Sequence, residues 1–306
     1  MRFKISRFWR VFPKIKMFFS ELELLQFPAI YPNKILPKPR KDLTSYLERF
    51  LGLKSNEDRY EFWSKSFLEK KYKNPSEQFI SDIVNKGYHK IDNVLSTSEH
   101  KNIIAIANNL LNLRPTIFGT TSDGVSTKIF LPNIYFLRCP SLLYLNKLIG
   151  KKFELFYGKF SKPQSLFISQ LKSVGRDNCD PNTDFHIDRF IPTLKAFYFP
   201  FPVDESNAPF SYIPSTGFFN KDFKKEYLES PNLIKLPQGK AFQLSKSYSF
   251  SSEPILFTNK GNTLVIADTS GLHRRTPFVG SGSRVLLGWA PYNTLTTMTI
   301  LRKSIF

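Results

Sequence analysis

The spacing of apolar positions divides the chain into a helical first part and a later part of short strands. Between residues 42 and 73, apolar side chains recur every three or four positions, as they do along one face of a helix. Further helices are predicted from Asn74 to Ile83, from a cap at Ser96 or Ser98 to Leu111, and from Ser141 to Leu148. Four prolines between residues 28 and 41 predict an extended connector ahead of these helices.

Short apolar runs dominate the chain beyond Phe153, where Pro, Gly, Asn and Asp break them at turn-like intervals. This pattern is typical of strands, and one earlier strand is predicted over Gly87–Leu95. Helices followed by strands indicate an α+β fold with a mainly β core, a sandwich or barrel with helices on one side. We expect residues 1–80 to form a basic arm and helical extension, and residues 81–306 to form the β domain. The predicted strand runs are 166–171, 194–199, 263–267 and 285–290.

The composition is that of a globular protein. Of the 306 residues, 41% are hydrophobic and 23% are charged, which argues against disorder. The two cysteines, Cys139 and Cys179, exclude a disulfide scaffold and a zinc finger, and they fit a reducing compartment. No apolar run approaches the roughly 20 residues of a membrane-spanning helix, and the first residues do not resemble a secretory signal. We therefore expect a cytoplasmic protein.

Positive charge is in excess and unevenly distributed. The chain has 44 Lys and Arg against 25 Asp and Glu, a formal charge of +19, which favours an anionic partner. Residues 1–41 hold ten basic and two acidic side chains, interleaved with aromatic ones. Such an arm could contact an anionic membrane surface weakly, or pack its aromatic side chains on the main domain, which we favour. No groove-reading motif is present, so no nucleic-acid partner is expected.

The candidate chemistry centres on two of the four histidines, since His89 and His100 have no acidic or histidine partner at ligand spacing. His186 and Asp188 are two positions apart, so in a strand they project from the same face. His273 follows a second predicted strand. Two histidines and one carboxylate form the facial triad that binds Fe(II) and leaves positions open for a 2-oxo acid and O2.

An arginine completes this pattern. Arg284 follows His273 by eleven residues and lies in the next predicted strand. Its guanidinium fork suits the far carboxylate of 2-oxoglutarate.

From about Lys86 to about Tyr292 the chain resembles the phytanoyl-CoA dioxygenase family of iron(II)/2-oxoglutarate oxygenases. The resemblance is carried by the segments Gly87–Leu95, Phe185–Asp188, Asn207–Thr216 and Gly261–Arg284. It implies a double-stranded β-helix, a cupin-like jelly roll with the metal in its mouth, here with flanking helices and an N-terminal helical extension.

The resemblance also implies the site. His186, Asp188 and His273 would hold Fe(II), and Arg284 would bind the co-substrate 2-oxoglutarate. Many members have a serine that contacts the oxo acid at the position that Arg275 takes here.

We expect Thr276, the nearest hydroxyl, to replace that serine. A second departure is Ser215–Gly217, where members often have Gly-Ser-His.

Other polar side chains on the predicted strands are candidates to line the pocket. Gln170 shares a strand face with Lys172, and Lys195 shares one with Phe197, so that Gln170 and Lys195 could contact the cofactor. Arg274 and Arg275, next to the triad, could hold an anionic substrate or form salt bridges.

These features predict a dioxygenase that hydroxylates a small, anionic organic substrate with release of succinate and CO2. Asp188 favours hydroxylation, because halogenating relatives replace this carboxylate with a small residue. The alternative is a catalytically inactive jelly roll that acts as a binding or scaffold protein through its basic arm. A nucleic-acid demethylase is a third, disfavoured possibility.

Overall fold

The computed structural model describes residues 56–64, 72, 75–112, 120–122, 126–131, 139–158, 163–172, 182–188, 191–220, 234–235, 242–243, 252–280 and 282–291. The chain divides into two compact units, residues 1–40 and 41–306, and every described residue belongs to the second. The predictions for the arm at residues 1–41 and for Cys179 lie outside the described residues. Among the helices of the described part, none has both the length and the apolar character to cross a membrane.

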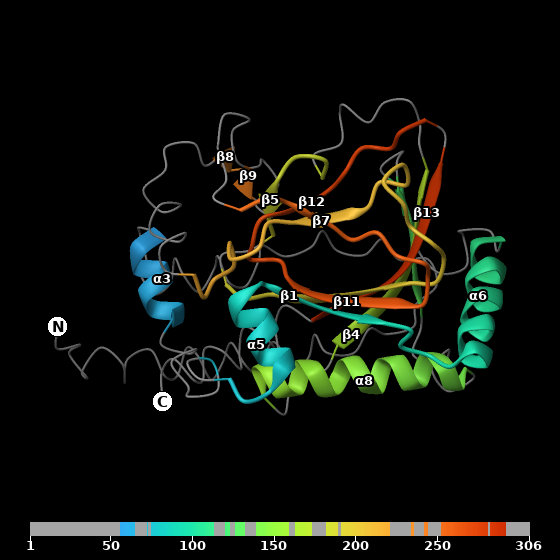
Figure 1. Ribbon diagram of the computed structural model, residues 1–306, viewed down its shortest axis with the longest axis horizontal. Helices are drawn as coiled ribbons and strands as arrows, with labels where there is room; N and C mark the ends of the chain where they lie inside the picture. Colours follow the sequence, from blue (N-terminus) through green and yellow to red (C-terminus); the bar gives the residue numbers. More distant parts are fainter. Residues whose placement is uncertain are drawn as a thin grey trace, which may run out of the picture. The chain divides into compact units, whose positions relative to one another are not determined.

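Two antiparallel sheets form the described β core, and Figure 1 shows strands of one sheet in a layer above strands of the other. The first sheet has the order β1 (Tyr88–Asp92), β11 (Thr263–Asp268), β6 (Leu194–Phe199), β13 (Ser283–Pro291), β4 (Pro163–Lys172), β3 (Ser126–Leu131) and β2 (Thr120–Ser122). The second has the order β10 (Ile255–Leu256), β7 (Phe210–Tyr212), β12 (His273–Arg275), β5 (His186–Ile187), β9 (Phe242–Gln243) and β8 (Ile234–Lys235). Apart from the consecutive pairs β2–β3, β3–β4 and β8–β9, neighbouring strands come from distant parts of the sequence, so the chain winds as a double-stranded β-helix, the predicted jelly roll.

The helices of the described part are α3 (Asn56–Ser64), α5 (Gln78–Asn85), α6 (Thr97–Asn112) and α8 (Pro140–Tyr157). Helix α5 contacts β1 and α8 contacts β4 of the first sheet, while α6 contacts α8, and α8 runs along the sheet in Figure 1. The predicted start of α6 is confirmed by a capping box. The Glu99 amide donates to Ser96 Oγ at 3.4 Å, and the Ser96 amide donates to Glu99 Oε2 at 3.1 Å.

The prediction that the helix after Ser141 ends at Leu148 and gives way to strands beyond Phe153 is wrong, because α8 continues to Tyr157. Ile149, Phe153 and Phe156 are three to four positions apart and fully buried, so one helix face stays against the core over the added turns. The helix ends at Gly158, which has a φ of +106°.

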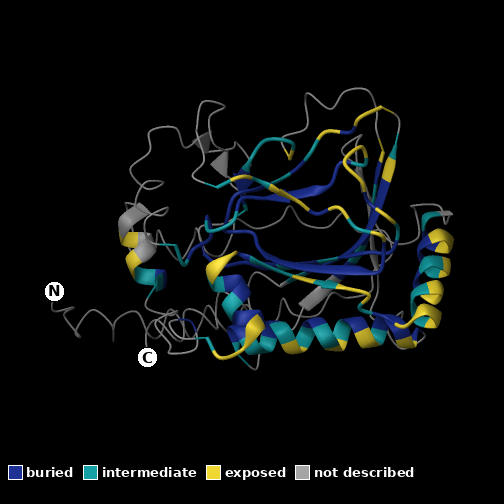
Figure 2. Ribbon diagram, viewed as in Figure 1, coloured by how far each residue is buried: buried dark blue, intermediate teal, exposed yellow. Residues whose placement is uncertain are grey.

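The first sheet separates two apolar layers, and Figure 2 shows buried residues along β11 and β7. Leu194, Ala196 and Tyr198 pack on the helix side with Phe153 and other residues of α8. The second layer lies between the sheets and contains the alternating positions of the same strands. Its members include Phe197, Phe199, Phe210, Tyr212, Val265, Ala267 and Leu286.

Two aromatic residues from before residue 81 belong to the core of the β domain. Trp63 and Tyr72 are buried in the helix-side layer, and the Tyr72 hydroxyl donates to the carbonyl of Phe156. The predicted boundary between residues 80 and 81 stays a prediction, while these two side chains contribute to the packing of the domain.

Candidate metal centre

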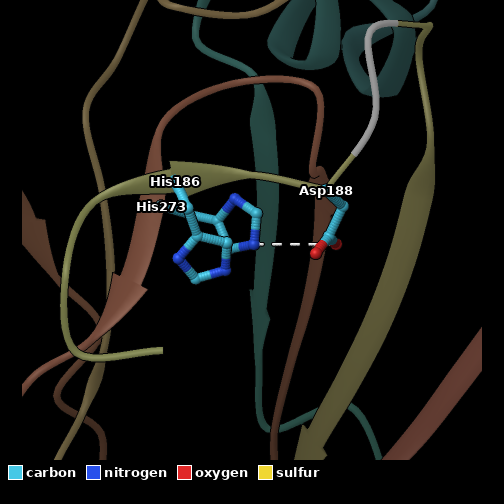
Figure 3. A group of neighbouring side chains, drawn as sticks. All are labelled: His186, Asp188 and His273. Carbon is cyan, nitrogen blue, oxygen red and sulfur yellow. Dashed lines mark ion pairs between the residues drawn. The ribbon is translucent and has the colours of Figure 1, made fainter. Parts of the chain in front are cut away.

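His186, Asp188 and His273 meet where two strands of the second sheet begin. His186 opens β5 and His273 opens β12, and the two residues are directly paired in the antiparallel register. Their ring centroids are 4.5 Å apart, and Asp188 follows β5 at once. One ligand atom from each of the three side chains lies within 4.8 Å of the others. Figure 3 shows the three side chains pointing toward one another. The fold therefore assembles the predicted triad.

Backbone carbonyls orient both imidazoles. Nδ1 of His186 donates to the carbonyl of Asp184 at 2.8 Å, and Nδ1 of His273 donates to the carbonyl of Gly271 at 2.9 Å. A carbonyl can only accept, so each Nδ1 carries a proton, and in the neutral imidazole the lone pair is then on Nε2. This is the tautomer that a metal-ligating histidine needs.

A buried aspartate that the sequence analysis overlooked holds the turn before His273. The Asp268 carboxylate accepts hydrogen bonds from the amides of Thr193 (2.8 Å) and Ser270 (3.0 Å). The Thr269 carbonyl then accepts from the amide of Asp188 at 2.9 Å. These bonds join the start of β6, the end of β11 and the residue after β5. In the sequence, the feature that could have revealed Asp268 is its position as a carboxylate at the end of an apolar strand.

Tyr212 confines the same turn. Its hydroxyl donates to the Asp268 carbonyl at 3.0 Å, and a Cβ added at Gly271 or at Gly87 would collide with that hydroxyl. Glycine is therefore required two residues before His273 by a close approach of backbone to ring.

The charges at the centre favour a neutral histidine beside an ionised carboxylate. Burial alone would raise the pKa of Asp188, but Lys195, His273 and His186 outweigh it and hold that pKa well below its usual value of 3.8. Burial, followed by the proximity of His186, lowers the pKa of His273 to about 3. At neutral pH the centre therefore offers a carboxylate oxygen and an unprotonated imidazole nitrogen, which are donors for a divalent transition metal.

Arg284 lies on the inner face of β13 and is 6% exposed. Its Nη1 donates to the carbonyl of Ala208, which has a φ of +55°, and its guanidinium lies 5.9 Å from the centroid of the Phe199 ring. Within the described part of the chain, its buried Nε has no hydrogen-bond partner. Burial, followed by the charge of Arg275, lowers the pKa of Arg284 to about 9, so the group is cationic at neutral pH. The residue is a buried cation with unused donor capacity.

The two residues after Arg274 differ in what they contact. Arg275 is buried and paired in register with Phe210, a member of the layer between the sheets, so it shares the inner face with His273. The Thr276 hydroxyl instead donates to the Pro209 carbonyl at 3.3 Å. Arg274 faces the other way, with its guanidinium 4.3 Å from the centroid of the Phe185 ring. The side chain that accompanies His273 on the inner face is therefore Arg275.

The two remaining candidates lie on opposite faces of the first sheet. Gln170 is paired with Val285, which packs on the helix side, so the register places Gln170 on the face opposite to Arg284. Lys195 lies on the inner face, and its Nζ contacts Asp188 Oδ2 at 2.5 Å. The fold thus brings Lys195 to the triad and does not bring Gln170 there.

Comparisons with known proteins give weak structural likenesses only. No protein-family model matches the chain, and no curated protein matches it in sequence. The epimerase SnoN, solved with Fe3+, alpha-ketoglutarate and nogalamycin RO, is similar at a TM-score of 0.48 and 14% identity, over 69% of this chain and 80% of that one.

Two further structures are similar at lower scores. HygX from Streptomyces hygroscopicus, with nickel, 2-oxoglutarate and hygromycin B bound, has a TM-score of 0.45 and 10% identity, over 71% of this chain and 86% of its own. EctD from S. alaskensis with bound Fe has a TM-score of 0.44 and 12% identity, over 69% of this chain and 74% of its own. At these identities and scores the likeness assigns no activity, which must be argued from the residues of this chain.

Proposed function

We propose that this protein is an Fe(II)/2-oxoglutarate-dependent oxygenase. The observation that carries the proposal is the set of three ligand atoms within 4.8 Å, two imidazole nitrogens and one carboxylate oxygen, presented by oriented side chains. This donor set is the one that non-haem Fe(II) oxygenases use. The bound iron and its oxo acid would supply the oxidising chemistry, and the protein would bind, orient and shield the reactants.

Each residue of the triad has a defined task in this proposal. His186 and His273 offer Nε2, because their Nδ1 protons are engaged by carbonyls. Asp188 brings the negative charge that lowers the cost of holding a divalent ion in a largely buried site. The resemblance to the phytanoyl-CoA dioxygenase family supports the same assignment for Phe185–Asp188 and Gly261–Arg284.

Arg284 is the proposed partner of the far carboxylate of 2-oxoglutarate. A buried guanidinium is costly unless its donors are satisfied, and an incoming carboxylate would satisfy the Nε that has no partner in the described structure. Arg275, on the face of His273, adds a second cation on this side. We assign it to the same carboxylate or to an anionic group of the substrate.

The reaction we assign is hydroxylation of a small anionic molecule by O2, with release of succinate and CO2. The carboxylate of Asp188 supports hydroxylation, since it occupies the position that halogenating enzymes leave to chloride. The anionic character of the substrate is supported by the net charge of +19 and by Arg275, which lies on the same face of β12 as His273. A membrane contact of residues 1–41 is a separate prediction that this assignment does not need.

Anaerobic titration with Fe(II) tests the metal centre. The wild-type protein should bind about one equivalent, and His186→Ala and His273→Ala should each lose most of that affinity, because two ligands hold the metal poorly. His100→Ala is the matched control, since His100 Nε2 bonds to the carbonyl of Pro200 instead. Unchanged iron binding in both triad variants would refute the assignment.

A second experiment separates the oxygenase from an inactive scaffold of the same fold. An oxygenase should release succinate from 2-oxoglutarate when iron and O2 are present, and many such enzymes do so slowly without substrate. The release should stop in His273→Ala. If the protein bound iron but released no succinate with any pool of metabolites supplied as substrate, the inactive scaffold would be favoured.

A further inference from the structure

Lys195 contacts the very oxygen of Asp188 that faces the histidines. Nζ of Lys195 lies 2.5 Å from Asp188 Oδ2, and the same Oδ2 lies 3.7 Å from Nε2 of His273. The side chains of Lys195 and Asp188 are only 31% and 22% exposed. The pair is therefore partly withdrawn from water, where an ion pair is screened less than at the surface.

The fold holds the ammonium in this place. Lys195 is on the inner face of β6, between its strand neighbours Leu194 and Ala196, which are fully buried on the helix side. The amide of Leu194 donates to the Tyr157 hydroxyl oxygen at 2.6 Å. Because both strand neighbours of Lys195 are buried in the core, the ion pair separates by rotation of the Lys195 or Asp188 side chain and not by movement of the β6 backbone.

Oδ2 is the carboxylate oxygen that lies 3.7 Å from Nε2 of His273, so a divalent metal held between these two atoms would bind the oxygen that Lys195 contacts. Two cations bound to one carboxylate oxygen repel each other, and the repulsion grows where water is partly excluded. The ammonium therefore opposes the metal in two ways. The ammonium would lose part of its contact with Oδ2 when the metal binds, and its positive charge would stay close to the metal.

We propose that Lys195 competes with the metal for Asp188 and holds the metal affinity of the triad below the value that its three ligands would otherwise give. Lys195 is thus a positioning residue, which aligns the carboxylate and tunes how readily the metal exchanges. The inference rests on the proposed function in so far as the triad is a metal site.

Metal titration of four full-length proteins tests this. The four proteins are the wild type, Lys195→Met, Lys195→Arg and the control Lys172→Met, which changes an exposed lysine of the same sheet. Each protein is freed of metal with a chelator and titrated with Mn(II), and EPR measures the free Mn(II). Lys195→Met should bind Mn(II) more tightly by on the order of 10-fold, because the competing charge is gone and the side-chain volume is kept. Lys195→Arg and Lys172→Met should stay within about threefold of the wild type. Equal or weaker binding by Lys195→Met would overturn the inference.

A thermal unfolding cycle in the presence of chelator measures the ion pair without any metal. Lys195→Met should lower the melting temperature by about 2–4 °C in the wild-type background and by much less in Asp188→Asn, because the partner charge is then absent. Equal decreases in both backgrounds would show that Lys195 has no special coupling to Asp188, and this too would overturn the inference. If the wild type bound no Mn(II) or Fe(II), the proposed function itself would fail, a result distinct from either of these.

Discussion

The two faces of the first sheet are formed by the same strands and have different roles. On the helix side, Tyr198 and Trp289 are buried with Phe153 in a continuous apolar layer. On the inner face, alternating positions of the same strands carry Lys195 and Arg284. Each inner charge has a specific polar contact, Asp188 Oδ2 for the lysine and the Ala208 carbonyl for the arginine.

The difference shows how one sheet can supply both stability and chemistry. Apolar packing tolerates many side chains of suitable volume, so the helix side mainly contributes free energy of folding. A buried charge is costly without its partner, so each inner position is tied to particular neighbours. Substitutions on the helix side should therefore change stability, and substitutions on the inner face should change binding.

The largest effect is expected on the helix side. Phe153→Ala should lower the free energy of unfolding by about 3–5 kcal/mol, because it removes a fully buried ring from the layer between α8 and the sheet. Tyr144→Ala, on the same helix but 46% exposed, is the control and should cost less than about 1 kcal/mol. Chemical denaturation measures both. Equal losses would mean that α8 does not stabilise the sheet through its buried face.

The next effect belongs to the inner face. Arg284→Lys should weaken 2-oxoglutarate binding by on the order of 10- to 150-fold, equivalent to about 1.5–3 kcal/mol, because an ammonium cannot reproduce the guanidinium fork. Fe(II) affinity should stay near the wild-type value. The anaerobic charge-transfer band of the iron–oxo acid complex reports the first quantity, and Arg274→Lys, on the other face of β12, serves as the control. An unchanged titration would mean that a residue other than Arg284 binds the far carboxylate of 2-oxoglutarate.

An effect that is small for each pH unit should appear in the pH dependence of stability without metal. The folded protein protonates His273 only near pH 3, whereas the unfolded chain protonates it near its usual pKa of 6.5. The unfolded state thus binds more protons between these values, so stability falls as the pH is lowered from about 6.5 towards 3, by at most about 1.4 kcal/mol per pH unit for this group. His273→Gln should flatten the curve of unfolding free energy against pH. An identical slope in that variant would assign the dependence to other groups.

The smallest effect is expected at Thr276, the residue predicted from the sequence to contact the oxo acid. Its hydroxyl donates to the Pro209 carbonyl, so Thr276→Val should change 2-oxoglutarate affinity by less than about threefold. Arg275→Gln should change it more, because Arg275 shares the inner face with His273. The reverse order would restore Thr276 as the ligand of the oxo acid.

Local pattern was enough to predict much of the fold and the triad. The strand predicted at 194–199 has these bounds in the structure, because its apolar run and the prolines on either side of it act over a few residues. His186 and Asp188 share a face by strand geometry alone, and His273 belongs to the second such motif. Helix α8 was predicted too short, since its last turns are defined by apolar contacts with the sheet.

The sequence by itself therefore determined the strand at 194–199, and it singled out His186, Asp188 and His273 as candidate ligands, with an arginine eleven positions beyond His273. Only the tertiary structure decided which face of each strand became the inside. The two faces of a strand are equivalent until helices cover one of them, and the pairing register then sets the side of every residue. That choice turned Gln170 away from Arg284 and placed Lys195 against Asp188. It also buried Asp268 beneath the turn to His273, where its partners come from β6 and from the turn itself.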